Sequence, residues 1–210
     1  MYERVLNEIE KPNRAHAIRV LQCLVVAVRP LRVEELAKIL AIDFDNEELP
    51  KLNLHWRWED QEQALMSSCS SLIAIAESDE SRIVEFSHFS VKEFLTSYRL
   101  ASSSRDISRY HIDLEPAHII LAQACMSVLL WSDDLVEESG IGIISPLAGY
   151  AAEHWTVHAQ FGRVSSSSHG RRWNIFLTQT SHILRLGFNY TTSTPITTQC
   201  HHPFTRSRSK

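Results

Sequence analysis

Two groups of histidines come closest to metal chemistry in this sequence. His154 and His158 lie four residues apart, so both imidazoles share one face of a helix and could in principle bind one ion. The residues between them lack the glutamate of the H-E-x-x-H signature, and no third ligand is evident. Cys200, His201 and His202 have no spaced partner. We therefore expect no metal site, and we interpret the first pair as part of an aromatic and histidine packing face.

Motifs for nucleotide binding and for covalent catalysis are missing from the chain. Only 6 glycines occur in 210 residues, and they form neither a G-x-x-x-x-G-K-[ST] phosphate loop nor a G-x-G-x-x-G dinucleotide loop. The G-x-S-x-G turn that presents the nucleophile of many lipases is also absent. We therefore expect no enzymatic activity, no cofactor and no small-molecule substrate.

The charge balance argues against a dedicated nucleic-acid binder. The chain carries 21 lysine and arginine residues against 25 aspartate and glutamate residues, a net charge of −4, whereas nucleic-acid-binding domains present a basic surface. The distribution is uneven, because no acidic residue occurs from His154 onward, where seven basic residues lie (Arg163, Arg171, Arg172, Arg185, Arg206, Arg208 and Lys210). We interpret this cationic segment as solvated.

Cysteine spacing and hydropathy indicate a cytoplasmic protein. The 4 cysteines lie far apart without a C-x-x-C pair, and the first 30 residues lack the order of a signal peptide. The most apolar stretch, residues 119–131, falls short of the roughly 20 residues that cross a bilayer. We expect a reducing, cytoplasmic location and no membrane span.

Helical periodicity begins at the first residues of the chain. Four apolar residues follow the i, i+3, i+4, i+7 pattern of an amphipathic helix (Tyr2, Val5, Leu6 and Ile9). Pro12 ends the pattern. Because an apolar stripe left in water gains nothing from packing, we expect it to be buried against another part of the chain or against a partner protein.

Three helices followed by a hairpin come next, and this order predicts a winged helix. The spacing predicts helices over 13–29, 31–42 and 61–69, and strands over 71–77 and 82–86.

The second of these helices is predicted to be amphipathic, with Arg32, Glu35 and Lys38 on its polar face. Residues 43–60 have no clean period and are predicted as a long loop that could include an edge strand.

Three further helices are predicted beyond the hairpin. The first covers residues 86–100, with Ser87 or Ser90 as its cap and four residues facing inward (Val91, Phe94, Leu95 and Tyr98). The second runs from Pro116 to Trp131 and is strongly apolar. The third lies within 146–161, and six of its residues share a face (Leu147, Tyr150, Ala151, His154, Trp155 and His158).

These elements predict a mainly α fold with a small β-hairpin wing, a winged helix followed by a helical extension. We place the winged-helix domain and its leading linker helix at 1–100, and the helical extension at 101–161. Residues 162–210 are predicted to form a cationic, largely disordered tail, in which 171–187 could form a helix.

Several segments, in this order, resemble one family: YERVLNEI, AIRVLQCLVVAVRPLRVEELAKILAID, SCSSLIAI, VEFSHFSVKEFL, HIILAQACMSVLL and PLAGYAAEHW. They are similar to the winged-helix region that follows the NACHT nucleotide-binding domain in fungal NACHT-ankyrin proteins, a module also known as the GPI inositol-deacylase-type winged helix domain. The resemblance covers roughly residues 1–160. It implies a regulatory piece of a STAND signalling NTPase.

The chain departs from that family at both ends, since it has no Walker motif and no T-P-L-H-x-A ankyrin signature. We therefore expect a fragment that lacks the NTPase and the ankyrin repeats. As partners we expect proteins, including a NACHT NTPase domain that packs on the N-terminal helix, but no membrane.

The resemblance also implies one candidate cofactor-binding residue, His88. In NACHT and related proteins, a histidine at the start of this segment contacts the phosphates of ADP and holds the closed state. His88 occupies that position in FSHFSVKEFL, and it would need an NTPase domain to supply the nucleotide. An imidazole N–H can donate to a phosphate oxygen. The alternative is a histidine that hydrogen-bonds locally at a helix start, between two buried phenylalanines.

Two functions follow from these observations. The resemblance and the charge distribution favour a non-catalytic module that regulates or binds other proteins. The alternative is a winged-helix DNA-binding protein, but the third helix has no lysine or arginine and the wing turn Asp79-Glu80 is acidic.

Overall fold

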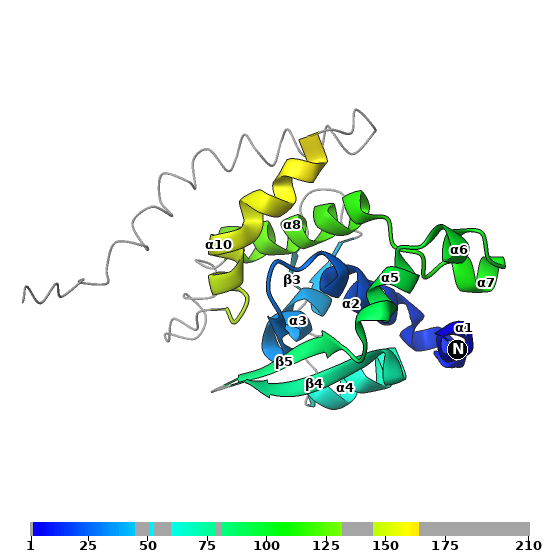
Figure 1. Ribbon diagram of the computed structural model, residues 1–210. Helices are drawn as coiled ribbons and strands as arrows, with labels where there is room; N and C mark the ends of the chain where they lie inside the picture. Colours follow the sequence, from blue (N-terminus) through cyan, green and yellow to red (C-terminus); the bar gives the residue numbers. More distant parts are fainter. Residues whose placement is uncertain (1, 45–50, 53–59, 79–80, 132–144, 164–210) are drawn as a thin grey trace, which may run out of the picture. The chain divides into compact units, whose positions relative to one another are not determined.

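The computed structural model describes residues 2–44, 51–52, 60–78, 81–131 and 145–163 (Figure 1). The predicted tail lies outside the described residues except for positions 162 and 163, and so does the helix predicted at 171–187. Within the described part the fold is mainly helical with a small antiparallel sheet, as predicted.

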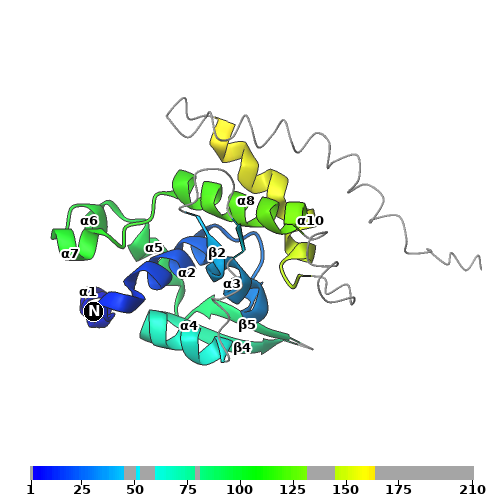
Figure 2. The same ribbon diagram turned by 180° about the vertical axis from the view of Figure 1, so that it is seen from behind.

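The predicted winged helix is confirmed between residues 14 and 86. Its elements, in chain order, are α2 (Arg14–Val26), β1 (Leu31–Arg32), α3 (Val33–Leu40), α4 (Gln61–Cys69), β4 (Ile73–Ser78) and β5 (Ser81–Phe86), with a short 3₁₀ turn η2 (Ser70–Leu72) before β4. Figures 1 and 2 show α2 between α8 (Leu114–Trp131) and the sheet.

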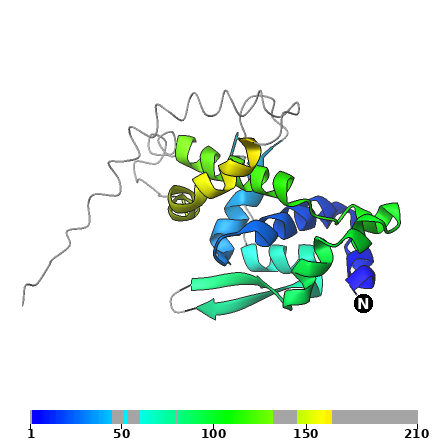
Figure 3. The same cartoon turned by 45° about the horizontal axis from the view of Figure 1, so that its top comes forward.

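The sheet has the order β1-β5-β4, and both pairings are antiparallel. In the wing hairpin Ile75 lies opposite Val84, while Leu31 of β1 pairs with Val84 from the other side. Figure 3 shows the β4–β5 hairpin along one side of α4. Sequence analysis missed β1, because two residues are too short for a period to be read.

A second pair of short strands lies mostly in the segment predicted as a long loop, although its first residue, Ile42, was predicted as the end of a helix. β2 (Ile42–Asp43) pairs with β3 (Lys51–Leu52) in antiparallel register. The prediction of a loop with an edge strand was therefore partly right, although the strand has a partner. Residues 45–50 and 53–59 lie outside the described residues.

One continuous core joins the winged helix to the helices around it. The largest fully buried side chains of the described residues come from the whole length of this core (Leu6, Leu21, Leu31, Leu36, Ile39, Leu65, Leu72, Leu95, Leu100, Tyr110, Leu121 and Tyr150). Helix α8 packs on α2, and α4 packs on both α2 and α3. Burial of these apolar side chains is the main stabilising term of the fold.

Helix α1 (Tyr2–Glu8) buries its apolar stripe inside the same chain. Val5, Leu6 and Ile9 are buried, and the Tyr2 ring packs at a tilt against Phe94 with ring centroids 5.3 Å apart. Its neighbours are η2 and α7 (Arg105–Ser108). A 3₁₀ turn, η1 (Lys11–Asn13), connects α1 to α2. The stripe was expected to pack against another part of the chain or against a partner protein. The structure shows that it packs against the chain itself.

The single helix predicted over 86–100 is two helices, α5 (Phe89–Leu95) and α6 (Tyr98–Ala101). The break falls at Thr96 and Ser97, and the Ser97 side chain accepts a hydrogen bond from the Leu100 backbone N–H. The expected inward position of Tyr98 is wrong, because this side chain is 85% exposed. The break turns α6 and shifts the apolar face to Leu100, which is fully buried.

The helical extension consists of α8, α10 (Ala148–Ala159) and a final 3₁₀ turn η3 (Gln160–Arg163). Both long helices lie where periodicity predicted them. The shared face of α10 is confirmed, since Leu147, Tyr150, Ala151 and His158 are buried. The other two members, His154 and Trp155, are half-buried. The proposed boundary between a domain of 1–100 and an extension of 101–161 stays a prediction.

Three cysteines lie in the core as free thiols, Cys23 in α2, Cys69 in α4 and Cys125 in α8. Burial raises the pKa of Cys23 and of Cys69 to about 12, and it raises the pKa of Cys125 as well. In the part of the chain that the structure describes, none of the helices combines the length and the apolar character needed to cross a membrane.

Candidate phosphate-contact histidine and buried polar junction

His88 is the first residue of interest because it caps α5. Its backbone is extended (φ −155°, ψ 144°), and its Nδ1 accepts a hydrogen bond from the Ser90 backbone N–H at 3.2 Å. The predicted cap, Ser87 or Ser90, is wrong. Ser90 lies inside the helix, and the Ser87 hydroxyl instead donates to the Ser71 carbonyl at 2.7 Å.

The capping bond determines which nitrogen of His88 points outward as a donor. Nδ1 must keep its lone pair to accept from Ser90, so the neutral ring carries its proton on Nε2. The Ser90 hydroxyl lies 2.6 Å from Nδ1 and 2.6 Å from the Tyr2 hydroxyl, which gives a chain from Tyr2 through Ser90 to the imidazole. His88 is exposed, and none of the described residues hydrogen-bonds to its Nε2.

The two phenylalanines beside His88 are not both buried. Phe86 is half-buried, whereas Phe89 is 71% exposed and lies against the imidazole with ring centroids 4.3 Å apart. The local hydrogen bond expected from the alternative interpretation is present, but the burial between two aromatic side chains is not. The histidine and Phe89 form an exposed pair at the start of α5.

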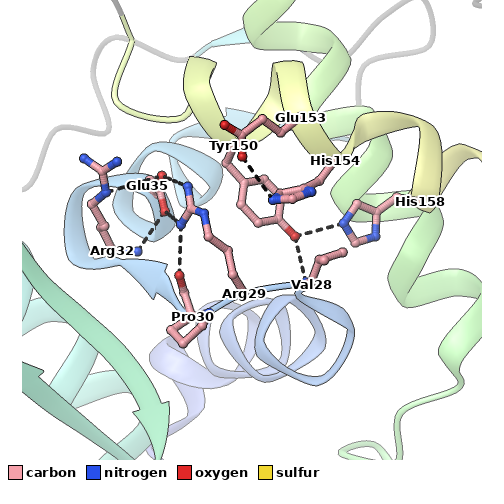
Figure 4. Close-up of polar contacts among 9 residues, drawn as sticks. All are labelled: Val28, Arg29, Pro30, Arg32, Glu35, Tyr150, Glu153, His154 and His158. Atoms are coloured by element: carbon pink, nitrogen blue, oxygen red, sulfur yellow. Dashed lines mark hydrogen bonds and ion pairs between the residues drawn. The ribbon is translucent and has the colours of Figure 1, made fainter. Parts of the chain in front are cut away.

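A second polar cluster, which sequence analysis missed, lies where α2, α3 and α10 meet (Figure 4). Its centre is Glu35, which was predicted on the exposed face of its helix and is 0% exposed. Arg29 donates to both carboxylate oxygens, at 2.6 and 2.8 Å, and the Arg32 backbone N–H donates to one of them at 2.8 Å. Glu35 thereby closes the N-terminus of α3, and its charge is paired.

Tyr150 connects this carboxylate cluster to α10. The Arg29 guanidinium lies over the Tyr150 ring, 4.9 Å from its centroid, in cation–π geometry. The Tyr150 hydroxyl accepts a hydrogen bond from the Val28 backbone N–H at 3.1 Å. It also lies 2.9 Å from His158 Nε2. Since the buried hydroxyl proton needs an acceptor, Tyr150 donates to His158.

His158 extends the hydrogen-bond chain from Tyr150 to His118 of α8. With Nε2 accepting from Tyr150, the neutral ring carries its proton on Nδ1, which lies 2.9 Å from His118 Nδ1. His118 stacks on Phe161 with ring centroids 3.7 Å apart. The four groups form one directed chain, which we call the Tyr150 relay: Val28 N–H, Tyr150 O–H, His158 and His118.

Burial shifts the acid–base behaviour of the relay. Desolvation, with the neighbouring His118 and His154, lowers the pKa of His158 to about 4. Desolvation and the charge of Lys92 lower the pKa of His118. Desolvation raises the pKa of the Tyr150 hydroxyl well above its usual range. All three groups are therefore neutral near pH 7.

The two histidines that were considered as metal ligands have different polar partners. Both ring nitrogens of His158 are hydrogen-bonded, one to Tyr150 and the other to His118. His154 Nε2 lies 3.5 Å from the Glu153 carboxylate. Among the described residues no group of three or more histidine, cysteine, aspartate or glutamate side chains could hold a metal ion. The packing interpretation of His154 and His158 fits this geometry. Cys200, His201 and His202 lie outside the described residues.

The third helix and the wing, which carry DNA contacts in many winged helices, are acidic here. Arg82 of β5 forms an ion pair with Glu62 of α4. Gln61, Glu62 and Gln63 occupy the first turn of that helix, which carries no lysine or arginine. The one wing arginine is thus neutralised by the helix beside it.

Two contacts of the junction that sequence analysis missed join distant parts of the chain. His118 and His158 are 40 positions apart, and Val28 and Tyr150 are 122 apart. The available signal was the R-P-L-R-V-E-E segment, in which Arg29 precedes Glu35 by six residues. That spacing matches no helical pair, because β1 lies between Arg29 and the helix that contains Glu35.

Comparisons with known proteins agree with this fold. Residues 2–105 match the family model described as GPI inositol-deacylase, winged helix domain. A curated relative, the azaphilone pigments biosynthesis cluster protein L of Monascus ruber, is 31% identical over 165 residues, which is 75% of this chain and 33% of that protein. The chain thus spans about a third of the length of that relative. No solved structure matches the chain. Residues 2–105 are therefore a winged helix domain of the GPI inositol-deacylase type.

Proposed function

We propose that the chain is a non-catalytic, cytoplasmic regulatory module that binds a NACHT-type NTPase domain and contacts its bound nucleotide through His88. The family match supports the coarser part, a winged-helix module. The NTPase partner rests on the resemblance to NACHT proteins described above. The free, scattered cysteines favour a reducing compartment.

One observation carries the proposed nucleotide contact. The cap bond of His88 fixes Nδ1 as an acceptor, so Nε2–H is the donor that an incoming phosphate would meet. The ring is exposed, and Phe89 supports it from one side. A side chain that is held at Nδ1 and presents Nε2–H loses little entropy when it binds an oxyanion.

The link between His88 and α1 suits this role. The Tyr2 hydroxyl reaches the imidazole through Ser90, with 2.6 Å for each step. In NACHT proteins the corresponding helix leads out of the NTPase domain, so its position and the orientation of the histidine would be coupled. The apolar stripe of α1 is occupied inside the chain, and the NTPase domain would therefore contact its exposed side.

A DNA-binding function is less well supported. The third helix lacks cations, and the ion pair of Arg82 with Glu62 withdraws the wing arginine from a phosphate backbone. A salt-sensitive shift of a labelled duplex at micromolar protein would favour DNA binding over the regulatory function.

The ADP affinity of the complex between this chain and a NACHT NTPase domain tests the proposal. His88→Asn keeps an efficient helix cap but removes the Nε2 donor. We expect ADP affinity, measured by titration calorimetry, to fall roughly 10-fold, as is typical when a charge-assisted hydrogen bond is lost. His111→Ala, a change of another histidine, serves as the control and should leave the affinity unchanged. Equal ADP affinities for the parent complex and His88→Asn would show that the proposed contact is wrong.

A further inference from the structure

The junction in Figure 4 contains two polar clusters. The polar groups of each cluster find hydrogen-bond partners within their own part of the fold. The first is Glu35 with Arg29 and the Arg32 backbone N–H, all of which belong to the winged helix. The second is His158 with His118, which belong to α10 and α8. Neither cluster needs the other for its own hydrogen bonds or charge pairing.

Tyr150 joins the two clusters. Its hydroxyl accepts from Val28 N–H on the winged-helix side and donates to His158 on the side of the extension. Its ring carries the Arg29 guanidinium, which holds Glu35 at the same time. Among the described residues, the hydrogen bond and the cation–π contact that join Val28 and Arg29 to α10 both involve this tyrosine.

The rest of α10 packs elsewhere. The described elements that α10 contacts extensively are α8 and η3, whereas α8 lies on α2 through the apolar core. Separation of α10 from Val28 and Arg29 would therefore leave the buried carboxylate of Glu35 paired. Breaking an attachment costs less when it leaves no unpaired buried charge behind.

From this arrangement we propose that Tyr150 is a positioning residue and a releasable latch, which holds α10 against the winged helix and lets α10 detach while the winged helix remains folded. The latch would transmit a change at Val28 and Arg29, which follow α2, to the helical extension. This inference goes beyond the proposed function, because it requires neither a nucleotide nor an NTPase partner.

Amide hydrogen exchange of the full chain, followed by mass spectrometry, tests the latch. Tyr150→Phe keeps the ring and its packing but leaves Val28 N–H and His158 Nε2 without their partner. We expect amide exchange in 148–159 to accelerate at least 10-fold, while exchange in α2, α3 and the β4–β5 hairpin stays unchanged. Tyr110→Phe, the same change at another buried tyrosine, is the matched control and should not affect α10.

Two outcomes would overturn the latch. One is equal acceleration of exchange in α10 and in the winged helix, which would mean that both unfold as one cooperative unit. The other is unchanged exchange in α10. Tyr150→Leu removes the ring as well and should accelerate exchange in α10 further. If this second variant does not fold, Tyr150→Phe alone decides.

Discussion

Glu35 illustrates how one buried charge shapes the winged helix. Periodicity placed it on an exposed polar face, because every third or fourth residue of that face is charged. The structure instead buries it under Arg29, whose guanidinium binds both oxygens. The bend at Arg29-Pro30 brings the arginine back over the start of α3. Sequence periodicity describes the faces of one helix. It cannot show that a residue from the preceding loop, here Arg29, covers one of those faces.

Removal of the Arg29 guanidinium should show how much the burial of the Glu35 carboxylate destabilises the fold when its charge is unpaired. Arg29→Met leaves the Glu35 carboxylate buried without its bidentate partner, and we expect the free energy of unfolding to fall by about 3 kcal/mol. Urea denaturation measures this loss. Arg99→Met removes the exposed ion pair with Glu3 and should cost less than about 1 kcal/mol. Equal losses in the two variants would show that the buried pair has no special weight.

Among the elements, α1 is predictable and α5 is only partly so. The i, i+3, i+4, i+7 stripe of α1 is intact in the structure, because Val5, Leu6 and Ile9 are all buried. The helix predicted over 86–100 breaks at Ser97, whose hydroxyl caps a new helix. Serine is common both in caps and on helix surfaces, so the pattern alone does not distinguish the two roles.

A single core residue of α1 tests how firmly this helix belongs to the fold. Leu6 is 0% exposed, and Leu6→Ala should lower the free energy of unfolding by about 3 kcal/mol through lost burial and a cavity. Equilibrium unfolding in urea gives the value. Arg4→Ala, on the exposed side of the same helix, should change it by less than about 1 kcal/mol. A loss for Leu6→Ala as small as that of the control would mean that α1 is only loosely attached.

At the scale of the molecule, the order of helices and hairpin was predictable and the polar junction was not. Apolar spacing located α2, α3, α4, α8 and α10 within a few residues. The face of α10 that carries His154 and His158 was also predicted. The partners of that face were not, since Val28 and His118 reach it only after the chain has folded.

The histidines of the relay predict how the whole fold responds to acid. His158 is neutral in the fold, with a pKa lowered from 6.5 to about 4, and it faces His118, His154 and Tyr150. Between these pH values the unfolded chain binds more protons, so stability is full above pH 6.5 and falls as pH decreases toward 4. The loss is about 3 kcal/mol at most.

Urea denaturation at a series of pH values measures that loss. His158→Gln has no titrating ring at this position, and its stability should decline less steeply between pH 6.5 and 4. Parallel pH profiles for the two proteins would assign the acid sensitivity to other groups.

The three buried thiols allow opening of the core to be followed by their chemical modification. Cys23, Cys69 and Cys125 lie in three different helices, and their raised pKa values keep them unreactive while the core is closed. An alkylating reagent can therefore reach one of these three thiols only when the helix that carries it has moved away from its neighbours. The order in which the three positions are alkylated would report the sequence of openings, from local fluctuation to complete unfolding, without a substitution in the chain.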